Sequence, residues 1–364
     1  MPKVILLAQL PLPYSKIGSW TTLYKNYFES RQPVDYIICK EPEARFQYVK
    51  YEIVAENLSH RLQKKFGKNN YGAYLSALEK VLSGGEKYII QIIDNFGIIP
   101  HLERFLLANG LRRRCYIQFF YHGYPPFYEN FYSRGFFEFI DEMVLLTHDS
   151  YTAHKEYYTV LPCRFSVVNN GIDTSRFHRV AAEKKRELKE KLGLEAEKTF
   201  IWCSQDRPKK GLGLILDAWK RIYEKNNNIA LIVIGAPRNE HIKGVSFLGR
   251  IPNENLPQYY QAADAYLFPT LCHEGFGLSL IEALHCGCYC IASALGGVPE
   301  VLHYGALGRL VEKPHFVSEW VEAVEEFISS EKEYPALPKK LYSKETWIGE
   351  MNQRILDAKK SLEE

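Results

Sequence analysis

With 364 residues the chain is too long for one ordinary hydrophobic core, and its length predicts two domains of about 100–200 residues each. Its 46% hydrophobic and 24% charged residues are typical of a globular protein, and a formal net charge of +3 gives no basis for nucleic-acid binding. The eight cysteines lie mostly in apolar runs and lack the spacing of zinc ligands. They predict free thiols in a reducing, cytoplasmic interior, and no metal site.

The first half of the chain alternates apolar runs of strand type with segments of helical pattern. No run approaches the roughly 18 apolar residues of a membrane span, and the opening MPKVILLAQLPLP suits a buried strand better than a signal peptide. The alternation predicts a Rossmann-like domain with a parallel sheet and binding sites at the C-terminal ends of strands. We expect its strands at 3–10, 34–39, 88–93, 115–120 and 143–147.

Three features of this half follow predicted strands, at the C-terminal ends where such a domain binds ligands. His122 follows the strand at 115–120, and Asp94-Asn95, which follows the strand at 88–93, is a candidate for the acceptor side. A loop histidine bonded only to backbone is the alternative for His122. The loop after the first strand contains Gly18 but lacks the GxGxxG of a dinucleotide-binding dehydrogenase, which argues against that function.

The first half is also basic in places and rich in aromatic residues, with most of the 25 tyrosines. Its basic stretches at 59–72 and 112–114 predict either a peripheral contact with an anionic membrane surface or an ordinary solvated face. The aromatic segment at 124–139 fits a sugar-stacking or lipid-facing rim, and it fits a packed core equally well.

The second half repeats the alternation of strands and helices. It follows VVNNGID at 167–173, and we place the boundary between the domains near 173–195. After a strand at 199–203, the loop SQDRPKKGL holds Lys210-Gly211, preceded by Gln205 and Arg207. For Arg207, a solvated loop cation is the alternative to a binding role. Further strands are expected at 229–234 and 245–248, and a charged helix at about 344–362.

Residues 266–302 organise the second half. A strand from Tyr266 to Pro269 leads into a glycine loop, Glu274-Gly275-Phe276-Gly277, and then into a helix from Leu278 to about His285. A second strand, 289–292, is followed by Gly296-Gly297. The loop offers free N–H groups at a helix N-terminus, where an anion such as a diphosphate is stabilised. Glu274 lies in this loop, and Glu282 lies eight residues on, in the helix.

These motifs resemble the donor site of the retaining glycosyltransferases of family 4. The resemblance lies in Glu274 and Glu282 within EGFGLSLIEAL, in GGVPEVL, in Lys210-Gly211 and in VVNNGID. It implies an α/β protein of the GT-B fold, with two Rossmann-like domains whose parallel sheets face each other across a central cleft. Residues 1–175 would form the acceptor-binding domain, 195–343 the nucleotide-sugar donor-binding domain, and 344–364 a C-terminal helix that crosses back to the N-terminal domain.

The resemblance also implies an activity, the transfer of a sugar from a UDP- or GDP-sugar to an acceptor hydroxyl with retention at the anomeric carbon. The acceptor would be a glycan or a lipid-linked precursor of a cell-surface polysaccharide. Because the nucleotide sugar is itself a substrate, no cofactor is expected. The absence of any Asp-x-Asp in the sequence agrees with a metal-independent reaction.

Roles for individual residues follow from the same resemblance. Glu282 would bind the ribose hydroxyls, and Glu274 the hydroxyls of the donor sugar. His122 and Lys210 would complete the reacting centre, and Arg207 would replace an arginine that the family usually has at the position of Gln205. The remaining donor-binding candidates are Gly18, Gly275, Phe276, Gly277 and Leu278.

Three other functions compete with this interpretation. A degenerate GT-B protein that binds a nucleotide sugar without turnover is favoured by Gln205. Another GT-B activity, such as a phosphorylase or an epimerase, would use the same site. A retaining glycosidase would need two carboxylates about 5 Å apart. Two observations argue against a glycosidase. Over the eight residues from Glu274 to Glu282 an ideal helix rotates by about 80°, and a loop of the phosphate-binding type has no purpose in such an enzyme.

Overall fold

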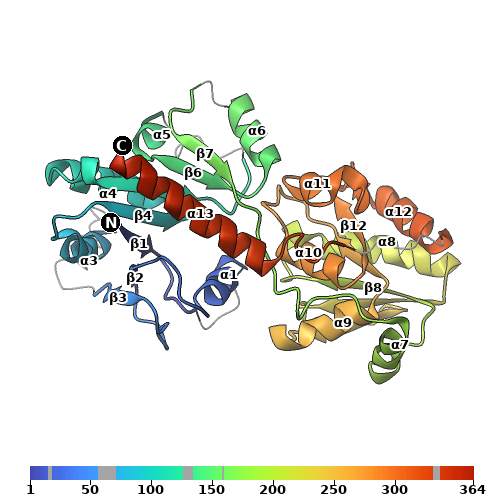
Figure 1. Ribbon diagram of the computed structural model, residues 1–364. Coiled ribbons are helices and arrows are strands. Elements are labelled where there is room, and N and C mark those ends of the chain that lie inside the picture. Colours follow the sequence, from blue (N-terminus) through green and yellow to red (C-terminus); the bar gives the residue numbers. More distant parts are fainter. Residues whose placement is uncertain (15–18, 56–70, 126–133, 158–159, 331–336) are drawn as a thin grey trace. The chain divides into compact units, whose positions relative to one another are not determined.

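The computed structural model describes residues 1–14, 19–55, 71–125, 134–157, 160–330 and 337–364 (Figure 1). The chain divides into two units. The first comprises Met1–Asn170 together with Lys344–Glu364, and the second comprises Gly171–Ser343. Each unit is built on its own parallel sheet. Among the described residues, no helix combines the length and the apolar character needed to cross a bilayer.

The first unit has a seven-stranded sheet in which every neighbouring pair is parallel. The central strands are buried along their whole length, as their continuous apolar sequences predict. The two outermost strands were not predicted, because each is short and carries polar residues. In spatial order the strands are β3 (Lys50–Ile53), β2 (Tyr36–Cys39), β1 (Lys3–Leu7), β4 (Tyr88–Ile93), β5 (Cys115–Phe120), β6 (Glu142–Leu145) and β7 (Arg164–Val167).

Helices cover both faces of this sheet. α3 (Gly72–Leu82), α4 (Ile99–Ala108) and α5 (Arg134–Phe139) share one hydrophobic core with alternate residues of the strands. α6 (His148–Tyr157) contacts β6 and β7. On β4 and β5 lies α13 (Lys344–Glu363), beside α1 (Ser19–Tyr27). The C-terminal helix thus belongs to the first unit, as the GT-B resemblance implies.

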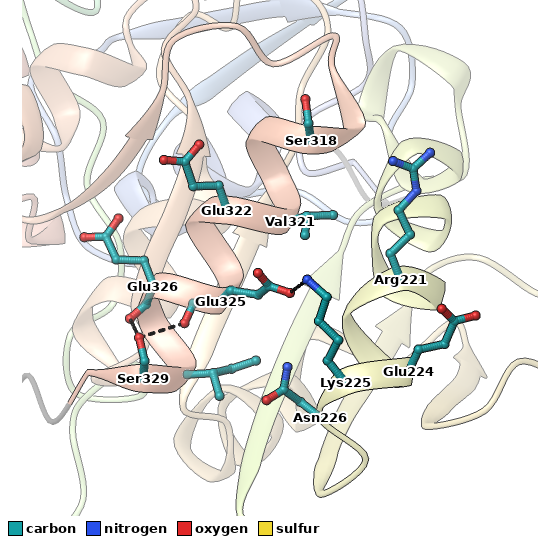
Figure 2. Close-up of a pocket in the computed structure, with 11 residues that line it drawn as sticks. Arg221, Glu224, Lys225, Asn226, Ser318, Val321, Glu322, Glu325, Glu326 and Ser329 are labelled. Carbon is teal, nitrogen blue, oxygen red and sulfur yellow. Dashed lines mark hydrogen bonds and ion pairs between the residues drawn. The ribbon is translucent and has the colours of Figure 1, made fainter.

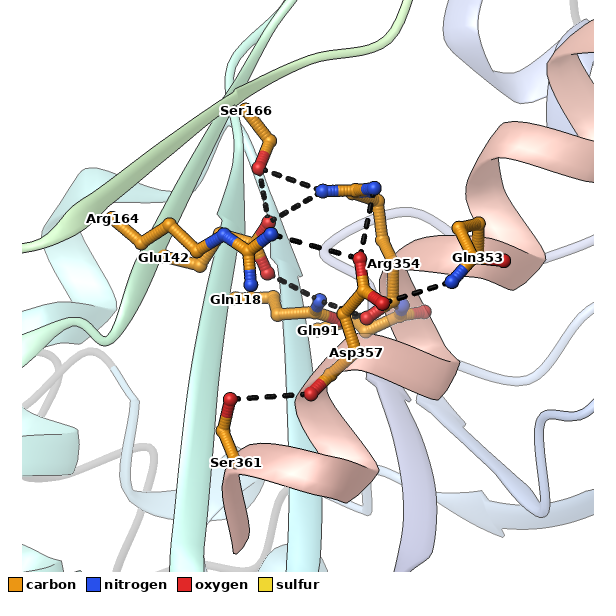
Figure 3. Close-up of polar contacts among 9 residues, drawn as sticks. All are labelled: Gln91, Gln118, Glu142, Arg164, Ser166, Gln353, Arg354, Asp357 and Ser361. Atoms are coloured by element: carbon orange, nitrogen blue, oxygen red, sulfur yellow. Dashed lines mark hydrogen bonds and ion pairs between the residues drawn. The ribbon is translucent and has the colours of Figure 1, made fainter.

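The surface of the sheet that α13 contacts is partly polar. Four side chains from adjacent strands form a hydrogen-bonded row, which we call the polar ladder: Gln91, Gln118, Glu142 and Ser166 (Figure 3). Glu142 is fully buried, and its carboxylate accepts from Gln118 at 2.8 Å and from Ser166 at 2.5 Å.

Arg354 of α13 completes the ladder. Its guanidinium lies 3.8 Å from Glu142, bonds Ser166 at 3.1 Å and pairs with Asp357 at 2.9 Å. A buried carboxylate needs a partner of this kind, since an uncompensated charge in a core is costly. The contacts fix both the position and the register of the last helix on the sheet.

The second unit has a six-stranded parallel sheet. In spatial order its strands are β10 (Val245–Gly249), β9 (Ile229–Ile234), β8 (Lys198–Cys203), β11 (Ala265–Phe268), β12 (Tyr289–Ser293) and β13 (Gly308–Val311). α8 (Leu212–Lys225) and α12 (Val317–Ser329) pack together in its main hydrophobic core, which contains Trp219 and Trp320. α9 (Leu256–Ala262) and α10 (Leu278–His285) pack against each other.

The charged helix α7 (Ala182–Lys191) belongs to the second unit, so this unit begins earlier in the chain than the predicted start at 195. Lys185 and Lys189 each lie 2.7 Å from the carboxylate of Asp264, which also accepts from the backbone N–H of Thr199. Burial opposes ionisation of Asp264, but the two lysines outweigh it and hold the pKa of this carboxyl below its usual value. The ion pairs tie α7 to the sheet.

Candidate donor site

The candidate site of the second unit lies where its strand order reverses. β8 is flanked by β9 on one side and by β11 on the other, so the loops that leave β8 and β11 diverge at their carboxyl ends. Ligands of open parallel sheets bind at this switch point. The loop after β8 carries Lys210, and the loop after β11 carries Glu274.

Lys210 and Glu274 form an ion pair across the switch point. The Lys210 Nζ and Glu274 Oε2 atoms are 2.5 Å apart, and the two side chains are 21% and 23% exposed. The ammonium also lies 5.8 Å from the centre of the Phe268 ring. At the end of a parallel sheet, such a pair offers a cation that can bind a phosphate and a carboxylate that can accept hydrogen bonds from hydroxyl groups.

Gly211 allows the two loops to approach each other. Its φ is +68°, and a Cβ atom at this position would lie 2.0 Å from the carbonyl oxygen of Pro269. The N–H of Leu271 donates to the carbonyl of Lys209 at 2.8 Å. Glycine at 211 is therefore required both by its dihedral angle and by space, which explains why it follows Lys210.

The loop at Gly296-Gly297 binds the backbone of Glu274. Gly296 and Glu274 form an isolated parallel bridge, and the N–H of Gly297 donates to the carbonyl of Glu274 at 2.8 Å. Gly296 has a φ of +69°, and a Cβ there would lie 2.4 Å from the Glu274 carbonyl oxygen. The second glycine loop is thus part of the site, because it holds the backbone that presents the carboxylate.

α10 begins at the glycine loop, as predicted. Gly277, with a φ of +87°, precedes its first residue, Leu278, and no side chain caps this end of the helix. Phe276 is buried at 2% exposure. Uncapped N–H groups and the helix dipole favour an anion here, and Gly275–Leu278 supply the backbone of that end.

Glu282 lies farther along α10, packed toward α9. Burial raises the pKa of its carboxyl to about 8, although the nearby Arg176 guanidinium and Tyr260 hydroxyl both act to lower it. Nearby, the Tyr266 hydroxyl donates to Ser279 at 2.8 Å. A carboxyl in such a setting is tuned by its surroundings, which is typical of a functional group.

The second cation expected near Lys210 is arranged differently. Gln205 and Arg207 are both exposed, and the N–H of Lys210 donates to the carbonyl of Arg207 at 2.8 Å. Between them, Asp206 forms two 2.8 Å hydrogen bonds with the guanidinium of Arg238. Sequence reasoning missed Arg238, which comes from the loop after β9 and has no motif around it.

The first unit places His122 beside Asp94, at the carboxyl ends of β5 and β4. One carboxylate oxygen of Asp94 accepts a hydrogen bond from the backbone N–H of His122 at 2.7 Å. The other oxygen lies 3.3 Å from Nδ1 of the His122 ring. Asp94 has a φ of +48°, an uncommon conformation for a residue other than glycine. Asn95 accepts from the N–H of Ile98 at 3.3 Å and so begins a turn.

Comparison with known proteins identifies the second unit. The family model "Glycosyl transferases group 1" matches residues 184–344. Residues 184–344 are a group 1 glycosyltransferase domain. The predicted family 4 type is thereby confirmed on the domain that carries Lys210, Glu274 and Glu282.

Curated relatives of the chain are similar to it over part of their length. The phosphatidyl-myo-inositol mannosyltransferase of Mycobacterium leprae is 30% identical over 123 residues, which are 31% of this chain and 33% of the relative. The D-inositol 3-phosphate glycosyltransferase of Mycobacterium sp. (strain KMS) is 28% identical over 188 residues, or 46% of this chain and 40% of the relative. The chain thus matches less than half the length of these relatives.

Solved structures extend the likeness to the whole chain. Sucrose-phosphate synthase from Thermosynechococcus elongatus has a TM-score of 0.71 at 15% identity, and 99% of this chain and 100% of that chain are covered. Anabaena HepE in complex with UDP and glucose has a TM-score of 0.65 at 16% identity, with the same coverage. At this identity the likeness shows the fold alone, and the fold is GT-B, with two Rossmann-like domains.

Other predicted features of the first unit have structural roles where the structure describes them. Arg112 bonds the carbonyls of Cys115 and Phe139 and pairs with Asp141 at 3.0 Å, and Arg114 bonds backbone carbonyls near Glu86. Of the three arginines, Arg113 is exposed.

Three predicted segments or residues lie partly or wholly outside the described residues: Gly18, 59–70 of the first basic stretch, and 126–133 of the aromatic segment. The end of the aromatic segment is packed core, since Phe136, Phe137 and Phe139 are buried.

A large surface groove of the second unit lies away from the candidate site. Its volume is about 860 Å³, and it runs between the last turn of α8 and the length of α12 (Figure 2). Lys225 and Glu325 pair across it at 2.8 Å. Because α8 starts at the carboxyl edge of the sheet and runs back, its last turn lies toward the opposite edge. None of the predicted site residues lines this groove.

Proposed function

We propose that this protein is a retaining glycosyltransferase that moves a sugar from a nucleotide-sugar donor to a hydroxyl of a saccharide or a lipid-linked saccharide. The observation that carries the proposal is the Lys210–Glu274 ion pair, held by Gly211 and Gly296 at the switch point of a group 1 glycosyltransferase domain. A UDP- or GDP-sugar is the donor class. Support for UDP comes from HepE, a protein of the same fold that is solved with UDP and glucose.

The chemistry of the transfer explains this set of groups. Cleavage of the bond between sugar and phosphate leaves extra negative charge on a nucleoside diphosphate, and preorganised donors must stabilise it. Lys210 and the N–H groups at the start of α10 supply that stabilisation. Before the donor binds, the pairing with Glu274 holds the Lys210 ammonium in place. A bound donor then gives its phosphate to Lys210 and sugar hydroxyls to Glu274.

The proposed reaction keeps the configuration of the anomeric carbon without a protein nucleophile. The leaving phosphate oxygen accepts the proton of the acceptor hydroxyl on the face from which it departs. His122, oriented by Asp94, is the candidate for binding the transferred sugar. In this scheme Lys210 and the helix N–H groups offset the negative charge of the leaving diphosphate, as a metal ion would otherwise do. No cofactor takes part.

The acceptor that we propose is a saccharide or inositol-type alcohol, free or attached to a lipid. The similar curated proteins are named for phosphatidyl-myo-inositol and D-inositol 3-phosphate, and both names contain the polyol inositol. A lipid-linked acceptor would bring the first unit to a membrane surface. Sedimentation with vesicles of anionic phospholipid at low salt tests this step, and protein left in the supernatant would remove the membrane contact from the proposal.

Turnover of the donor tests the proposed activity. The purified protein is incubated with UDP-glucose, UDP-N-acetylglucosamine or GDP-mannose, with and without EDTA, and release of the nucleoside diphosphate is measured. We expect one donor to be consumed in the presence of EDTA. Lys210→Met and Glu274→Gln should each slow release about 10²- to 10³-fold. Lys209→Met is the matched control, because Lys209 is an exposed lysine of the same loop, and its rate should stay near wild type.

A binding protein without turnover is the second candidate, and Gln205 is the residue that favours it. In that case a nucleotide sugar would bind with a defined affinity, yet no diphosphate would be released with any acceptor offered. Equal rates for Lys210→Met and Lys209→Met would contradict the role assigned to Lys210.

A further inference from the structure

Residues Leu341–Ser343 lie against the glycine loop of the donor site. The ring of Tyr342 meets the ring of Phe276 edge to face, with centres 5.2 Å apart and planes at 89°. Both rings are buried, at 9% and 2% exposure. Phe276 is the residue between the two glycines of the loop, so its position determines where the neighbouring N–H groups point.

Tyr342 is held in an unusual backbone conformation. Its φ is +51°, which is strained for a bulky aromatic residue and persists only where the surroundings enforce it. Its hydroxyl donates to the carbonyl of Val301 at 3.2 Å, and its own carbonyl accepts from the N–H of Ile172 at 2.9 Å. The side chain and the backbone are therefore both fixed.

A second contact joins the same segment to α10. Nε2 of His285, the last residue of the helix, lies 2.7 Å from the carbonyl oxygen of Leu341. His285 is 8% exposed. Phe276 precedes α10 and His285 ends it, so both ends of the element that forms the anion site rest on Leu341–Ser343.

Leu341–Ser343 is also where the chain leaves the second unit, since the first unit resumes at Lys344. The other passage enters the second unit at Gly171. Ile172 and Ser343 form a parallel bridge, next to the Ile172–Tyr342 hydrogen bond. We call Gly171–Asp173 and Leu341–Ser343 the crossing pair. Tyr342 contacts Phe276 and Leu341 contacts His285 of α10, so both contacts join the donor loop and its helix to the crossing pair.

We propose that Tyr342 is a positioning residue that couples occupancy of the donor loop to the crossing pair. This rests on the proposed function, because the occupant is the nucleoside diphosphate part of the donor. A diphosphate bound by the N–H groups of Gly275–Leu278 fixes the loop and with it Phe276. Through the edge-to-face contact Phe276 fixes Tyr342, and the crossing pair becomes more ordered. In the reverse direction, the Tyr342 ring preorganises the loop for the anion.

Hydrogen exchange of the intact protein tests the coupling, with UDP, GDP or ADP as the probe, whichever binds by calorimetry. In wild type the nucleotide should slow exchange both in peptides that cover the donor loop and in peptides that cover the crossing pair. In Tyr342→Leu the protection should persist at the loop and vanish at the crossing pair. The nucleotide dissociation constant should rise about 2- to 12-fold, the range of an aromatic pair.

Phe327→Leu is the matched control. Phe327 is a buried ring of the same unit with the same 9% exposure, and it packs on Phe200 and Tyr289 away from the donor loop. It should lower the melting temperature but keep both the affinity and the protection of the crossing pair. Tyr342→Phe, which retains the ring, should also keep them. If Tyr342→Leu does not fold, Phe276→Leu removes the same contact from the other side and should uncouple the crossing pair.

The outcomes separate the two proposals. Protection of the loop without protection of the crossing pair in wild type overturns the coupling and leaves the proposed function standing. Identical behaviour of Tyr342→Leu and Phe327→Leu also overturns it, because the effect would then be general loss of packing. Failure of all three nucleotides to bind contradicts the proposed function, and the coupling falls with it.

Discussion

Glu282 is a carboxyl whose charge depends on pH near neutrality. Burial raises its pKa to about 8, so at pH 7 the free protein holds this group mostly as the neutral acid. A ribose diol donates hydrogen bonds and prefers a carboxylate. If Glu282 binds the ribose, nucleotide binding must shift its pKa downward and release a proton.

We therefore expect nucleotide affinity to rise between pH 6.5 and 8.5 and to level off above the pKa. Calorimetry in buffers of different ionisation enthalpy would detect the released proton at pH 7. Glu282→Gln should bind more weakly and show neither the pH dependence nor the proton release. An unchanged pH profile in Glu282→Gln would contradict the assigned role.

The same pKa has a consequence for stability that serves as a control. The folded-state value of about 8 exceeds the ordinary value of 4.5, so the folded state holds the proton more tightly than the unfolded state. The stabilisation from this group is complete below about pH 4.5 and is lost as the pH rises through 8. Glu282→Gln removes the penalty, and its melting temperature should exceed that of wild type at pH 9.

Among the described residues, Arg207 and Arg238 are two candidates for a second cation that binds the phosphate beside Lys210. Arg238 is already bonded twice to Asp206, whereas Arg207 is exposed in the same loop as Lys210. We expect Arg207→Gln to weaken nucleotide binding by about tenfold, and Arg238→Gln to change stability more than affinity. Titration of each variant with the nucleotide measures both. The reverse order of affinities would assign the second cation to Arg238.

At the scale of elements, the sequence predicted what depends on neighbours in the chain. β4, β5 and β9 are continuous apolar runs, and α10 begins after a glycine loop where expected. The edge strands β3 and β7 were missed because KYEI and RFSV are short, partly exposed and polar. An edge strand needs only one partner, so its sequence carries little hydrophobic signal.

The supports of the site could not be predicted for a related reason. Gly296 was recognised as a loop residue, but its packing on the backbone of Glu274 is a contact through space. Tyr342 against Phe276, and Arg238 against Asp206, likewise join residues far apart in the sequence. Without a motif or a covarying partner, a single sequence carries no sign of such pairs. The motifs predicted the residues proposed to bind the ligand, and the structure shows the contacts that hold those residues in position.

The element α13 depends on the polar ladder, which makes a specific prediction. Arg354→Met leaves the buried carboxylate of Glu142 without its cation, and removal of one partner of a buried pair costs about 3–5 kcal/mol. Glu142→Gln should cost less, because Arg354 keeps Asp357 as a partner. Hydrogen exchange of amides in β5, β6 and α13 should accelerate roughly 100-fold or more in Arg354→Met. Equal, small effects of both variants would show that apolar packing alone holds α13.

For the whole molecule, length predicted two domains and the alternation of strand and helix patterns predicted their α/β class, and the fold is GT-B. The chain passes between the units twice, at Asn170–Gly171 and at Ser343–Lys344. The predicted donor groups Lys210, Glu274 and Glu282 all lie in the second unit, which is the group 1 domain. We therefore expect this unit to recognise a nucleoside diphosphate.

Thermal unfolding with UDP, GDP and ADP tests that claim most directly. A nucleotide at a hundred times its dissociation constant should add about 2.7 kcal/mol to the stability of the folded state. We predict that one of the three raises the melting temperature of wild type and of Lys209→Met, and that Lys210→Met and Glu282→Gln lose the shift. A shift that survives in both Lys210→Met and Glu282→Gln, or no shift with any nucleotide, would contradict the donor site described for this protein.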